Sequence, residues 1–460
     1  MNSLRCNLAK SGMAILVGLG LASMLACGGG NSPQGSTTPT TAWSGAQVLE
    51  SNLLFNSRYP SVAVDDSGNA MAAWQRDSGG VYDLWAKPLL AASGWQPEGT
   101  IESMDGNATD ARMAVSSSGH FMVTWSQFSV GNTECAINVR RWKAGSTMDS
   151  VLRLNDLNVV GYFPSVAMDG AGNACVSWME ANALSGRFEI KLSQFSQSTT
   201  TWSAPLLVSS AVAQDAAWPT VAMDPSGNTV ITWLQSADLQ NGPYYHYACR
   251  YKVGSGWSTP FPIMLGTGGV AGNALAMSAS GAIAAWTETL DGGVTFQTYA
   301  AKWTAATDAI STPVLVSTAG VDTYSPSLGM DAAGNALVAW VQARTSATDL
   351  VVSSCSSSGG WAATPKILVS SANVGGVKLS MNASGNAAMI WQQKDGTVWS
   401  MNGALYAPAS GWSSSTLLES DNAGNAFSPE IHIGANGQAV AVWYQLDASG
   451  VRHVYANRAK

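Results

Sequence analysis

A segment of about 15 residues recurs eight times along the 460-residue chain, and this repeat constrains the fold more than any other feature. The copy from Pro164 to Trp178 reads PSVAMDGAGNACVSW, and the copy from Pro219 to Trp233 reads PTVAMDPSGNTVITW. The copies end at Trp74, Trp125, Trp178, Trp233, Trp286, Trp340, Trp391 and Trp443, at intervals of 51 to 55 residues. Eight copies at one period indicate a single repeat architecture rather than several unrelated domains.

Each repeat is predicted to form four antiparallel strands. A stretch such as PSVAMD has the short alternating pattern of a strand, and ACVSW has the β-branched and aromatic content of a second one. The D-x-x-G-N between them is typical of a tight turn, because Asp bonds nearby amides and Gly or Asn accepts positive φ. A third strand such as FEIKLSQF and a fourth such as WSAPLLVSS follow. Such a unit matches one propeller blade and is too short for an immunoglobulin-like sandwich.

The two ends of the chain predict how the blades close into a ring. The chain stops just after a third strand, VRHVYANRA, so the eighth unit lacks its fourth strand. The segment WSGAQVLES, from Trp43 to Ser51, matches the fourth-strand pattern WSSSTLLES. We therefore predict an all-β fold in which residues 43–460 form one eight-bladed β-propeller of four-stranded antiparallel blades, closed by the N-terminal strand. A seven-bladed propeller with one stray unit is the alternative.

The first 42 residues have the composition of an export signal followed by a tether. Arg5 and Lys10 precede the apolar run GMAILVGLGLASMLA, which is too short for a comfortable membrane span. The stretch SMLAC resembles the lipobox of bacterial lipoproteins, and this resemblance implies that residues 1–27 are a signal peptide ending at a lipidated Cys27. Residues 28–42, rich in Gly, Ser, Thr and Pro, are expected to be a flexible tether. The expected location is the bacterial cell envelope, with Gly28 implying the outer membrane; secretion is the alternative.

The repeated hairpin P-x-V-A-x-D-x-x-G-N resembles the NHL-type propeller repeat and, more distantly, the Asp-box of sialidases. These resemblances imply a propeller fold and carry little about activity, because one fold hosts many functions.

Charge and cysteine usage exclude several classes of function. The net charge is −7 and there is no basic stripe, so nucleic acid is not an expected partner. An acidic protein has no electrostatic attraction to an anionic membrane, so membrane contact is expected only through the lipid anchor. The chain is expected to be a monomer. The cysteines outside the signal region lie in predicted strands without any C-x-x-C pair, and are expected to be buried free thiols: Cys135, Cys175, Cys249 and Cys355.

Neither a metal nor another cofactor is expected. Calcium loops need several oxygen ligands in one short loop, whereas each turn here supplies one Asp that Ser or Asn replaces in other copies. The Asp residues at this position are Asp65, Asp169, Asp224 and Asp331.

A second repeated feature is Trp-x-Gln/Glu, which only the first copy breaks, with Arg76. The favoured interpretation is a side chain that caps the backbone of the adjoining loop; a polar ring on one face is the alternative.

Candidate binding residues lie where the copies differ. The loops before the first strand and after the second strand share one face of a propeller, and variable loops on a rigid scaffold carry function. The aromatic candidates on this face are Tyr59, Tyr162, Phe163, Trp218, Tyr244, Tyr245, Tyr324 and Phe427. A charged cluster near the channel mouth is predicted from Arg58, Asp110, Arg112, Lys378, Glu430 and His432. Charges paired for solubility, or an irregular closing blade, are the alternative explanation of that cluster.

Two functions remain open from the sequence. The first is a non-catalytic, envelope-anchored binding or scaffold module that takes a protein or glycan on its loop face. The second is a carbohydrate-active enzyme, a sialidase-like glycosidase or lyase, that uses the charged cluster. The sequence contains no nucleophile elbow, HExxH, P-loop or dinucleotide fingerprint, which disfavours an enzyme without deciding the matter.

Overall fold

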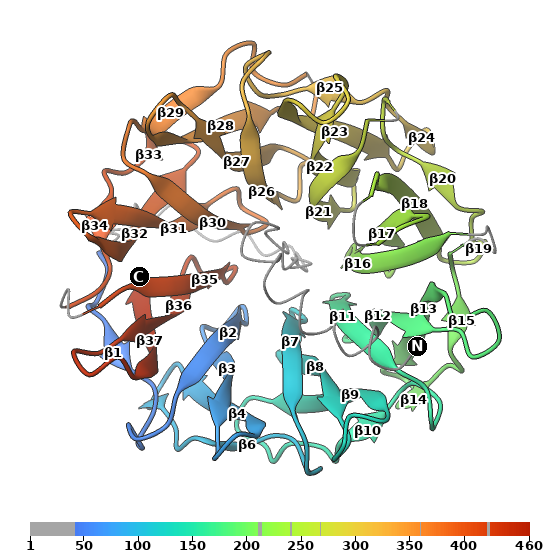
Figure 1. Cartoon of the computed structure of the whole chain (residues 1–460), viewed down its shortest axis with the longest axis vertical. Coiled ribbons are helices and arrows are strands. Elements are labelled where there is room, and N and C mark those ends of the chain that lie inside the picture. Colours follow the sequence, from blue (N-terminus) through green and yellow to red (C-terminus); the bar gives the residue numbers. More distant parts are fainter. Residues whose placement is uncertain (1–41, 210–213, 240–241, 267, 359, 421–423) are drawn as a thin grey trace.

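Eight β-sheets are arranged as blades around a central channel in the computed structural model of the protein (Figure 1). The structure describes residues 42–209, 214–239, 242–266, 268–358, 360–420 and 424–460. The described residues form strands and turns and no helix, and none of their elements is an apolar helix long enough to span a bilayer. The predicted eight-bladed, all-β propeller is confirmed.

Each blade has an inner strand beside the channel, two middle strands and an outer strand, and each strand runs antiparallel to its neighbour. The inner strands are β2 (Ser57–Val64), β7 (Ala108–Val115), β11 (Gly161–Met168), β16 (Asp215–Met223), β21 (Val270–Ser278), β26 (Thr323–Met330), β30 (Val374–Met381) and β35 (Ala426–Ile433). The second strands are β3 (Ala70–Asp77), β8 (His120–Phe128), β12 (Ala174–Ala181), β17 (Thr229–Ser236), β22 (Gly281–Thr289), β27 (Ala336–Ala343), β31 (Ala387–Asp395) and β36 (Ala439–Leu446).

The outer half of each blade is built from one long and one or two very short strands. The third strands are β4 (Tyr82–Leu90), β9 (Cys135–Lys143), β13 (Phe188–Ser196), β18 (Tyr245–Lys252), β23 (Phe296–Thr304), β28 (Thr348–Cys355), β32 (Val398–Ala407) and β37 (Arg452–Ala459). The outer strands are β1 (Gln47–Val48), β5 (Gly94–Trp95), β6 (Gly99–Thr100), β10 (Leu152–Arg153), β14 (Thr201–Trp202), β15 (Leu206–Leu207), β19 (Gly256–Trp257), β20 (Phe261–Pro262), β24 (Ala309–Ile310), β25 (Val314–Leu315), β29 (Lys366–Val369), β33 (Gly411–Trp412) and β34 (Thr416–Leu417). Such short edge strands offer little backbone to a second chain.

The N-terminal strand completes the last blade, as the sequence predicts. Strand β1 pairs antiparallel with β37, with Gln47 opposite Ala456 and Val48 opposite Tyr455. The eighth sheet therefore has the order β1-β37-β36-β35 and joins the first described strand to the last (Figure 1). This closure leaves no blade without its fourth strand.

The repeated tryptophans form the core between neighbouring blades. All eight tryptophans that end the repeat are at most 1% exposed, and each lies in a cluster of buried apolar side chains. A second set of tryptophans lies near the outer strands and packs against third-strand rings, as Trp202 does on Phe195 and Trp257 on Tyr251. The tryptophan repeat is therefore packing, with each side chain burying on the order of 200 Å².

The D-x-x-G-N segment is a turn held by its own side chains. In blade 3, Asp169 Oδ1 accepts the backbone N–H of Asn173 at 2.8 Å, and Asp169 Oδ2 accepts its side-chain amide at 2.6 Å. Asn173 Oδ1 in turn accepts the backbone N–H of Gln197, which ties the turn to the end of β13. Copies with the same Asp and Asn repeat these bonds, so the Asp residues serve the turn.

The four cysteines Cys135, Cys175, Cys249 and Cys355 are buried and unpaired in the structure, as predicted. Burial raises the pKa of each thiol, so all four remain protonated. The predicted signal peptide 1–27, Cys27 and most of the tether lie outside the described residues.

A β-bulge interrupts every inner strand near its start. The register shifts in all eight blades, and one residue at each shift has a left-handed backbone with φ between 49° and 68°. These residues are Tyr59, Asp110, Phe163, Trp218, Gly272, Ser325, Gly376 and Ser428. A bulge changes the direction in which a side chain points, and glycine is the residue that adopts this backbone without strain. Six of the eight blades nevertheless use another residue there.

Candidate functional site

The bulges lie on the face of the propeller that also carries the ends of the second strands and the starts of the third strands. We call this the loop face, and the opposite side, with the D-x-x-G-N turns, the turn face. Four aromatic residues of blades 3 and 4 form a continuous contact on the loop face. Ring centroids are 6.2 Å apart for Tyr162 and Phe163, 6.4 Å for Phe163 and Trp218, and 5.5 Å for Trp218 and Tyr244. We call Tyr162, Phe163, Trp218 and Tyr244 the blade 3–4 aromatic group.

The blade 3–4 aromatic group is held by contacts with the buried cores on both sides of blade 4, with neighbouring rings and with the backbone. Trp218 and Tyr244 pack against the buried clusters on both sides of blade 4, and Phe128 and Phe188 contact Tyr162. Tyr244 also donates its hydroxyl hydrogen to the carbonyl of Leu239 at 2.7 Å. These contacts restrain the rings, and Phe163 and Trp218 are half-buried.

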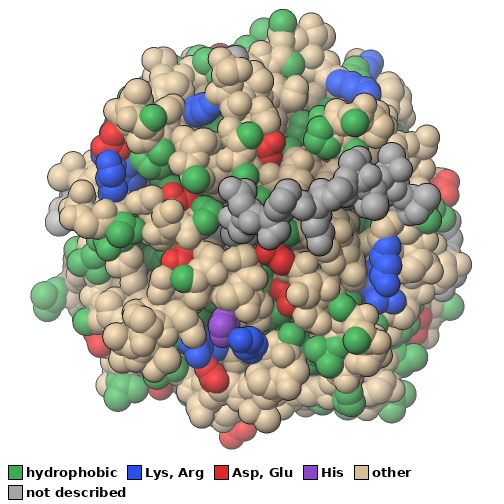
Figure 2. All heavy atoms as spheres, turned by 180° about the vertical axis from the view of Figure 1, so that it is seen from behind, with side chains coloured by type: hydrophobic (Ala, Val, Ile, Leu, Met, Phe, Trp, Pro, Cys, Tyr) green, Lys and Arg blue, Asp and Glu red, His purple; other side chains and the backbone are tan. Residues whose placement is uncertain are grey.

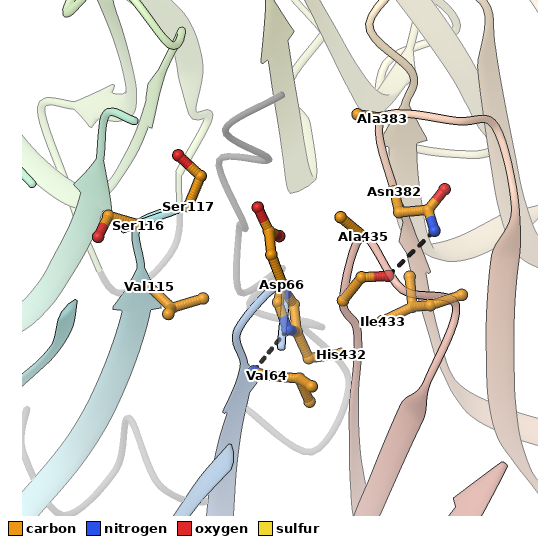
Figure 3. Close-up of a pocket in the computed structure, with 11 residues that line it drawn as sticks. Val64, Asp66, Val115, Ser116, Ser117, Asn382, Ala383, His432, Ile433 and Ala435 are labelled. Carbon is orange, nitrogen blue, oxygen red and sulfur yellow. Dashed lines mark hydrogen bonds between the residues drawn. The ribbon is translucent and has the colours of Figure 1, made fainter. Parts of the chain in front are cut away.

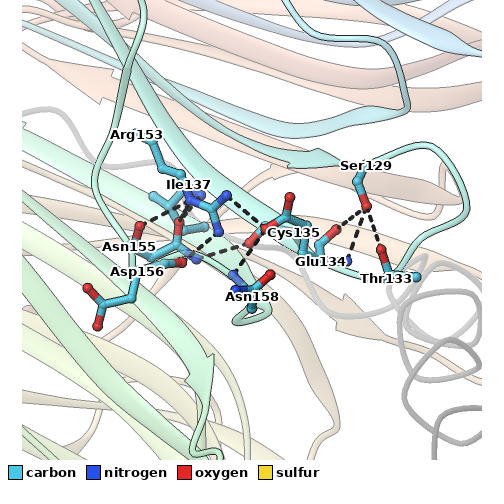
Figure 4. Close-up of polar contacts among 9 residues, drawn as sticks. All are labelled: Ser129, Thr133, Glu134, Cys135, Ile137, Arg153, Asn155, Asp156 and Asn158. Atoms are coloured by element: carbon cyan, nitrogen blue, oxygen red, sulfur yellow. Dashed lines mark hydrogen bonds and ion pairs between the residues drawn. The ribbon is translucent and has the colours of Figure 1, made fainter.

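Polar contacts fix the loop that enters blade 3 (Figure 4). Arg153 Nη1 pairs with Glu134 Oε2 at 2.9 Å, and the same oxygen accepts the backbone N–H of Asn158. Asn155 bridges to β9 by accepting the N–H of Ile137 and donating to the carbonyl of Cys135. The hydrogen bond from Arg153 lowers the pKa of Glu134, which keeps it charged. These contacts hold the segment that leads directly into Tyr162 and Phe163.

A second aromatic group joins blades 8 and 1. Tyr444 lies 5.6 Å from Phe427 and 6.2 Å from Tyr59, measured between ring centroids. The guanidinium of Arg58 lies over the ring of Tyr82 at 3.8 Å and near Tyr59 at 5.1 Å. We call Tyr59, Tyr82, Phe427 and Tyr444, with Arg58, the blade 8–1 group.

The predicted charged cluster is divided into separate parts. Lys378 Nζ and Glu430 Oε1 pair at 3.0 Å between blades 7 and 8. In blade 2, Asp110 accepts the hydroxyl of Thr109, and Arg112 donates to the carbonyl of Ala111. Burial raises the pKa of Asp110, against the opposing charge of Arg112. Arg58 donates to Gln75 and belongs to the blade 8–1 group.

His432 lies away from these charges, at the turn-face end of β35. Its Nδ1 accepts the backbone N–H of Val64 at 2.7 Å, across the seam between blades 8 and 1 (Figure 3). Serines do the same at other seams: Ser165 accepts from Val221, and Ser380 accepts from Ile433. His432 is 3% exposed and burial lowers its pKa to about 3, so it is a neutral hydrogen-bond acceptor in the fold. His432 lies about 7 Å further along β35 than Glu430, because each residue of a strand advances it by about 3.3 Å. The two side chains therefore lie at different depths in the channel wall.

The Trp-x-Gln/Glu motif closes a local hydrogen bond. In blade 3, Trp178 Nε1 donates to Glu180 at 2.8 Å, and in blade 2, Trp125 donates to Gln127 at 2.9 Å. Four further copies form the same bond. The same side chains also bind loop backbone, as Gln127 does at the carbonyl of Gly106. The motif therefore caps a loop, as the sequence favours, and in addition satisfies the buried indole.

Arg76 breaks the motif because it serves the closure of the ring. Its guanidinium lies 2.9 Å from Glu98 and 3.6 Å from Glu50, and it stacks over Trp85 at 4.0 Å. Glu50 follows the closing strand β1 and also accepts the N–H of Val454 at 2.6 Å and the hydroxyl of Ser57 at 2.8 Å. This buried network joins blade 8, the incoming chain and blade 1.

The remaining aromatic candidates stand apart from both groups. Tyr245 begins β18 and is half-buried, and Tyr324, in blade 6, is 43% exposed. Sequence reasoning missed Tyr444, Tyr82, Phe128 and Phe188. Tyr444 could have been found from the repeat, because the middle residue of Trp-x-Gln lies opposite the residue before the bulge. Tyr444 lies opposite Phe427 in this way.

Two hollows lined by described residues lie on the turn face. A cavity of about 20 Å³ is lined by Val64, Asp66, Ser116, Asn382 and His432 (Figure 3), which is room for one water. An open depression of about 480 Å³ lies beside Ser280, Lys302 and Ser357. Seen from behind in Figure 2, the molecule shows mostly uncharged side chains, with acidic and basic groups in small separate patches. Among the described residues no group of His, Cys, Asp and Glu side chains has metal-binding geometry.

Comparisons with known proteins support the fold. Comparison with family models and with curated proteins gave no match. Among solved structures, the Dos1 propeller is similar with a TM-score of 0.51 and 8% identity over 92% of this chain and 95% of that one. A polysaccharide lyase, a PL25 ulvan lyase, aligns with a TM-score of 0.49 and 11% identity over 80% and 95% of the two chains. A Hadza microbial sialidase, Hz136, gives 0.38 and 12% over 92% and 94%. The likeness to the Dos1 propeller, at 8% identity, shows the fold alone and agrees with the eight blades of this chain.

Proposed function

We propose that the protein is a non-catalytic binding or scaffold module that takes a protein or glycan ligand on its loop face. The observation that carries this proposal is the pair of aromatic groups on that face, which rigid strands hold around the channel mouth. Large rings held in position give contact area at a low entropic cost on binding. Trp, Tyr and Arg are also the residues that most often dominate binding energy at interfaces.

The alternative of a carbohydrate-active enzyme is not favoured by the arrangement of its charged residues. Lys378 and Glu430 neutralise each other, and Arg58 lies on an aromatic ring. His432 is neutral and engaged with the backbone of Val64. A glycosidase needs two carboxyl groups flanking one bond, and the acidic candidates Asp110 and Glu430 belong to blades 2 and 8, each beside its own basic neighbour.

Truncating two rings of the blade 3–4 aromatic group is expected to weaken ligand capture. The double variant Trp218→Ala/Tyr244→Ala should weaken binding to any ligand found on arrays of envelope proteins and glycans by more than about tenfold. Binding is measured by surface plasmon resonance at a temperature where both proteins are folded. Tyr251→Ala removes a ring from the turn face and controls for lost packing, because Tyr251 packs against Trp257 with ring centroids 5.3 Å apart. If the double variant and the wild type bind equally well, the loop face is not the binding site.

The envelope location is proposed from the sequence of residues 1–42, where Cys27 ends a lipobox-like stretch. Cys27→Ser is expected to move the protein from the membrane fraction to the soluble fraction and to stop incorporation of labelled fatty acid. An acyl chain contributes about 0.8 kcal/mol per buried CH₂, so the loss of attachment should be nearly complete. Retention of the Cys27→Ser variant in the membrane fraction would contradict the anchor, and release of the wild type would support secretion.

A further inference from the structure

Large apolar side chains are exposed mainly on the loop face. Of the described residues, 22 have large apolar side chains that are exposed, and 13 of these lie in loop-face connections or at the bulges. Eight more lie in the short outer strands, and one, Val253, lies on the turn face. The five that are at least 73% exposed are all on the loop face: Leu54, Val130, Leu157, Leu184 and Val294. A concentration of exposed apolar side chains on one face is typical of an interaction surface.

The charges that are not buried are also divided unequally between the two faces. Each charged residue belongs to one face by the nearer end of its strand or by the connection that holds it, and Glu98 belongs to the loop face because it binds Ser51 and Arg76. Among the described residues that are not buried, the loop face carries 15 acidic and 7 basic residues, a net charge of −8. The turn face carries 4 acidic and 12 basic residues, a net charge of +8. The loop face is therefore an acidic surface, and the net charge of −7 for the whole chain does not reveal this division.

Carboxylates and exposed apolar side chains occur in the same loops of the acidic face. Met104 lies between Glu102 and Asp105 in the loop that enters blade 2, and it is exposed. Leu157 follows Asp156 in the loop that enters blade 3. The latter loop leads into the blade 3–4 aromatic group, so carboxylates, aliphatic side chains and rings follow one another from blade 2 to blade 4.

The carboxylates at the entry to blade 2 repel one another. Burial raises the pKa of Glu102, and the charges of Asp83 and Asp105 raise it further. Within the described ranges, none of these three carboxylates forms an ion pair with a basic side chain. A cationic group placed among them would relieve this repulsion, whereas an anionic group would add to it.

The shape of the loop face distinguishes between cationic ligands. A sugar ring stacks on an open, flat aromatic face, but Trp218 and Tyr244 cover one another edge to face, with 73° between their ring planes. A second copy of this chain could offer its basic turn face, but Val253 is the one large apolar side chain exposed there among the described residues. The apolar side chains of the loop face would then lack a partner. A segment of another protein can supply basic and apolar side chains together.

From these observations we infer that the loop face over blades 2, 3 and 4 binds a segment of a partner protein in which Lys or Arg residues stand among apolar ones. The basic side chains pair with the carboxylates of Glu102, Asp105 and Asp156. The apolar side chains pack on Met104, Leu157 and the blade 3–4 aromatic group. This inference rests on the proposed binding function and adds the class of ligand. Charge complementarity of this kind raises the association rate and makes binding sensitive to salt.

The test uses the full-length protein and an array of random-sequence peptides, each made in matched versions with Lys, Gln or Glu at the same positions. The Lys versions should bind at least about tenfold more tightly than their Gln partners, and the Glu versions most weakly. Raising the salt from about 50 to about 300 mM should weaken the Lys versions most, because salt screens exposed charges.

Two matched pairs of variants separate the charged from the apolar contribution. Glu102→Gln/Asp105→Asn should weaken the Lys versions by about fivefold or more and leave the Gln versions unchanged. Asp149→Asn/Asp308→Asn removes two exposed carboxylates from the turn face and should bind like the wild type.

The apolar contribution is tested at two exposed positions that do not support the core. Leu157→Ser, on the loop face, should weaken the Lys and Gln versions alike, by about threefold or more. Val253→Ser, on the turn face, is the control and should bind like the wild type.

The outcomes separate this inference from the proposed function. Peptide binding without preference for Lys, or equal binding by Glu102→Gln/Asp105→Asn and the wild type, would overturn the basic-segment assignment. So would salt-sensitive self-association that this variant abolishes, or capture by phosphatidylcholine vesicles alone. Arrayed glycans are the second arm: capture of a glycan that depends on Trp218, without capture of Lys peptides, would overturn the assignment while supporting the binding function. If neither proteins nor peptides nor glycans bind, both fail.

Discussion

Replacing Arg76 by alanine is expected to lower the free energy of unfolding by about 3–5 kcal/mol, because two buried carboxylates lose their counter-charge. Arg76 is 2% exposed, and the side chains of Glu50 and Glu98 are 0% and 7% exposed. Glu50 follows the closing strand, so the loss should appear as early separation of blade 8 from blade 1. Urea unfolding followed by tryptophan fluorescence measures the free energy of unfolding. Faster hydrogen exchange at β1 and β37 would show that the loss of stability arises at the seam between blades 8 and 1.

A compensated variant distinguishes lost charge from lost packing. Arg76→Gln restores the residue that other copies carry, and with Glu50→Gln and Glu98→Gln it removes the charges together. This triple variant should recover most of the stability, because a buried ion pair often contributes little over a neutral replacement. Arg141→Ala is the surface control: its partner Asp149 is 54% exposed, so the loss from that pair should stay below about 1 kcal/mol. A loss from Arg76→Ala no larger than the control's would show that the network does not secure the closure.

Acid is expected to destabilise the propeller through two buried histidines. Burial lowers the pKa of both His246 and His432 to about 3, although Asn273 opposes the shift at His246. An unfolded histidine titrates near 6.5, so below that pH the unfolded chain binds protons that the folded protein does not. Each histidine therefore removes about 1.4 kcal/mol of stability per pH unit as the pH falls from about 6.5 towards 3. At pH 5 the expected loss is about 2 kcal/mol for each.

Substitutions that keep the contacts without the titrating ring should flatten this dependence. His246→Phe retains an aromatic ring against Trp286, which lies 5.1 Å from His246. His432→Gln retains an oxygen that can accept the Val64 N–H. Urea unfolding at pH 7, 6 and 5 compares the wild type with the double variant, whose stability should fall by about 4 kcal/mol less over this range. Equal slopes for the two proteins would mean that other groups dominate acid unfolding.

Several features of the fold follow directly from local sequence. The eightfold recurrence of the tryptophan defines the blades, because each repeat buries its apolar side chains only against its neighbours. The segment WSGAQVLES matches a fourth strand in the one unit that lacks one, which predicts the closure. D-x-x-G-N contains all the side chains that hold its turn, from Asp169 to Asn173, so its role is also readable from the sequence.

The candidate site was only partly predictable. The sequence placed aromatic residues on the loop face, and six of the eight candidates do lie in the two aromatic groups. The contacts between these rings could not be predicted. Tyr59 and Tyr444 meet across the seam between blades 8 and 1, although they are 385 residues apart in the sequence. The bulge that positions Tyr59 is occupied by different residue types in different blades, so no sequence pattern marks it. Glu430 and His432 were predicted to belong to one charged cluster because they share one side of a strand. In the structure Glu430 pairs with Lys378, whereas His432 binds the backbone of Val64.

The number of blades, their strands and their closure follow from local sequence, because repeat period, alternation and turn chemistry act over a few residues. The partners of Arg76, the role of His432 and the grouping of the aromatic side chains are visible only in the folded protein. These three features depend on contacts between blades, where residues hundreds of positions apart in the sequence meet. They also depend on where along its strand a side chain lies, because one end of the strand is at the loop face and the other at the turn face. His432 shows the difference most clearly, since only the folded ring brings its imidazole to the backbone of Val64, 368 residues away.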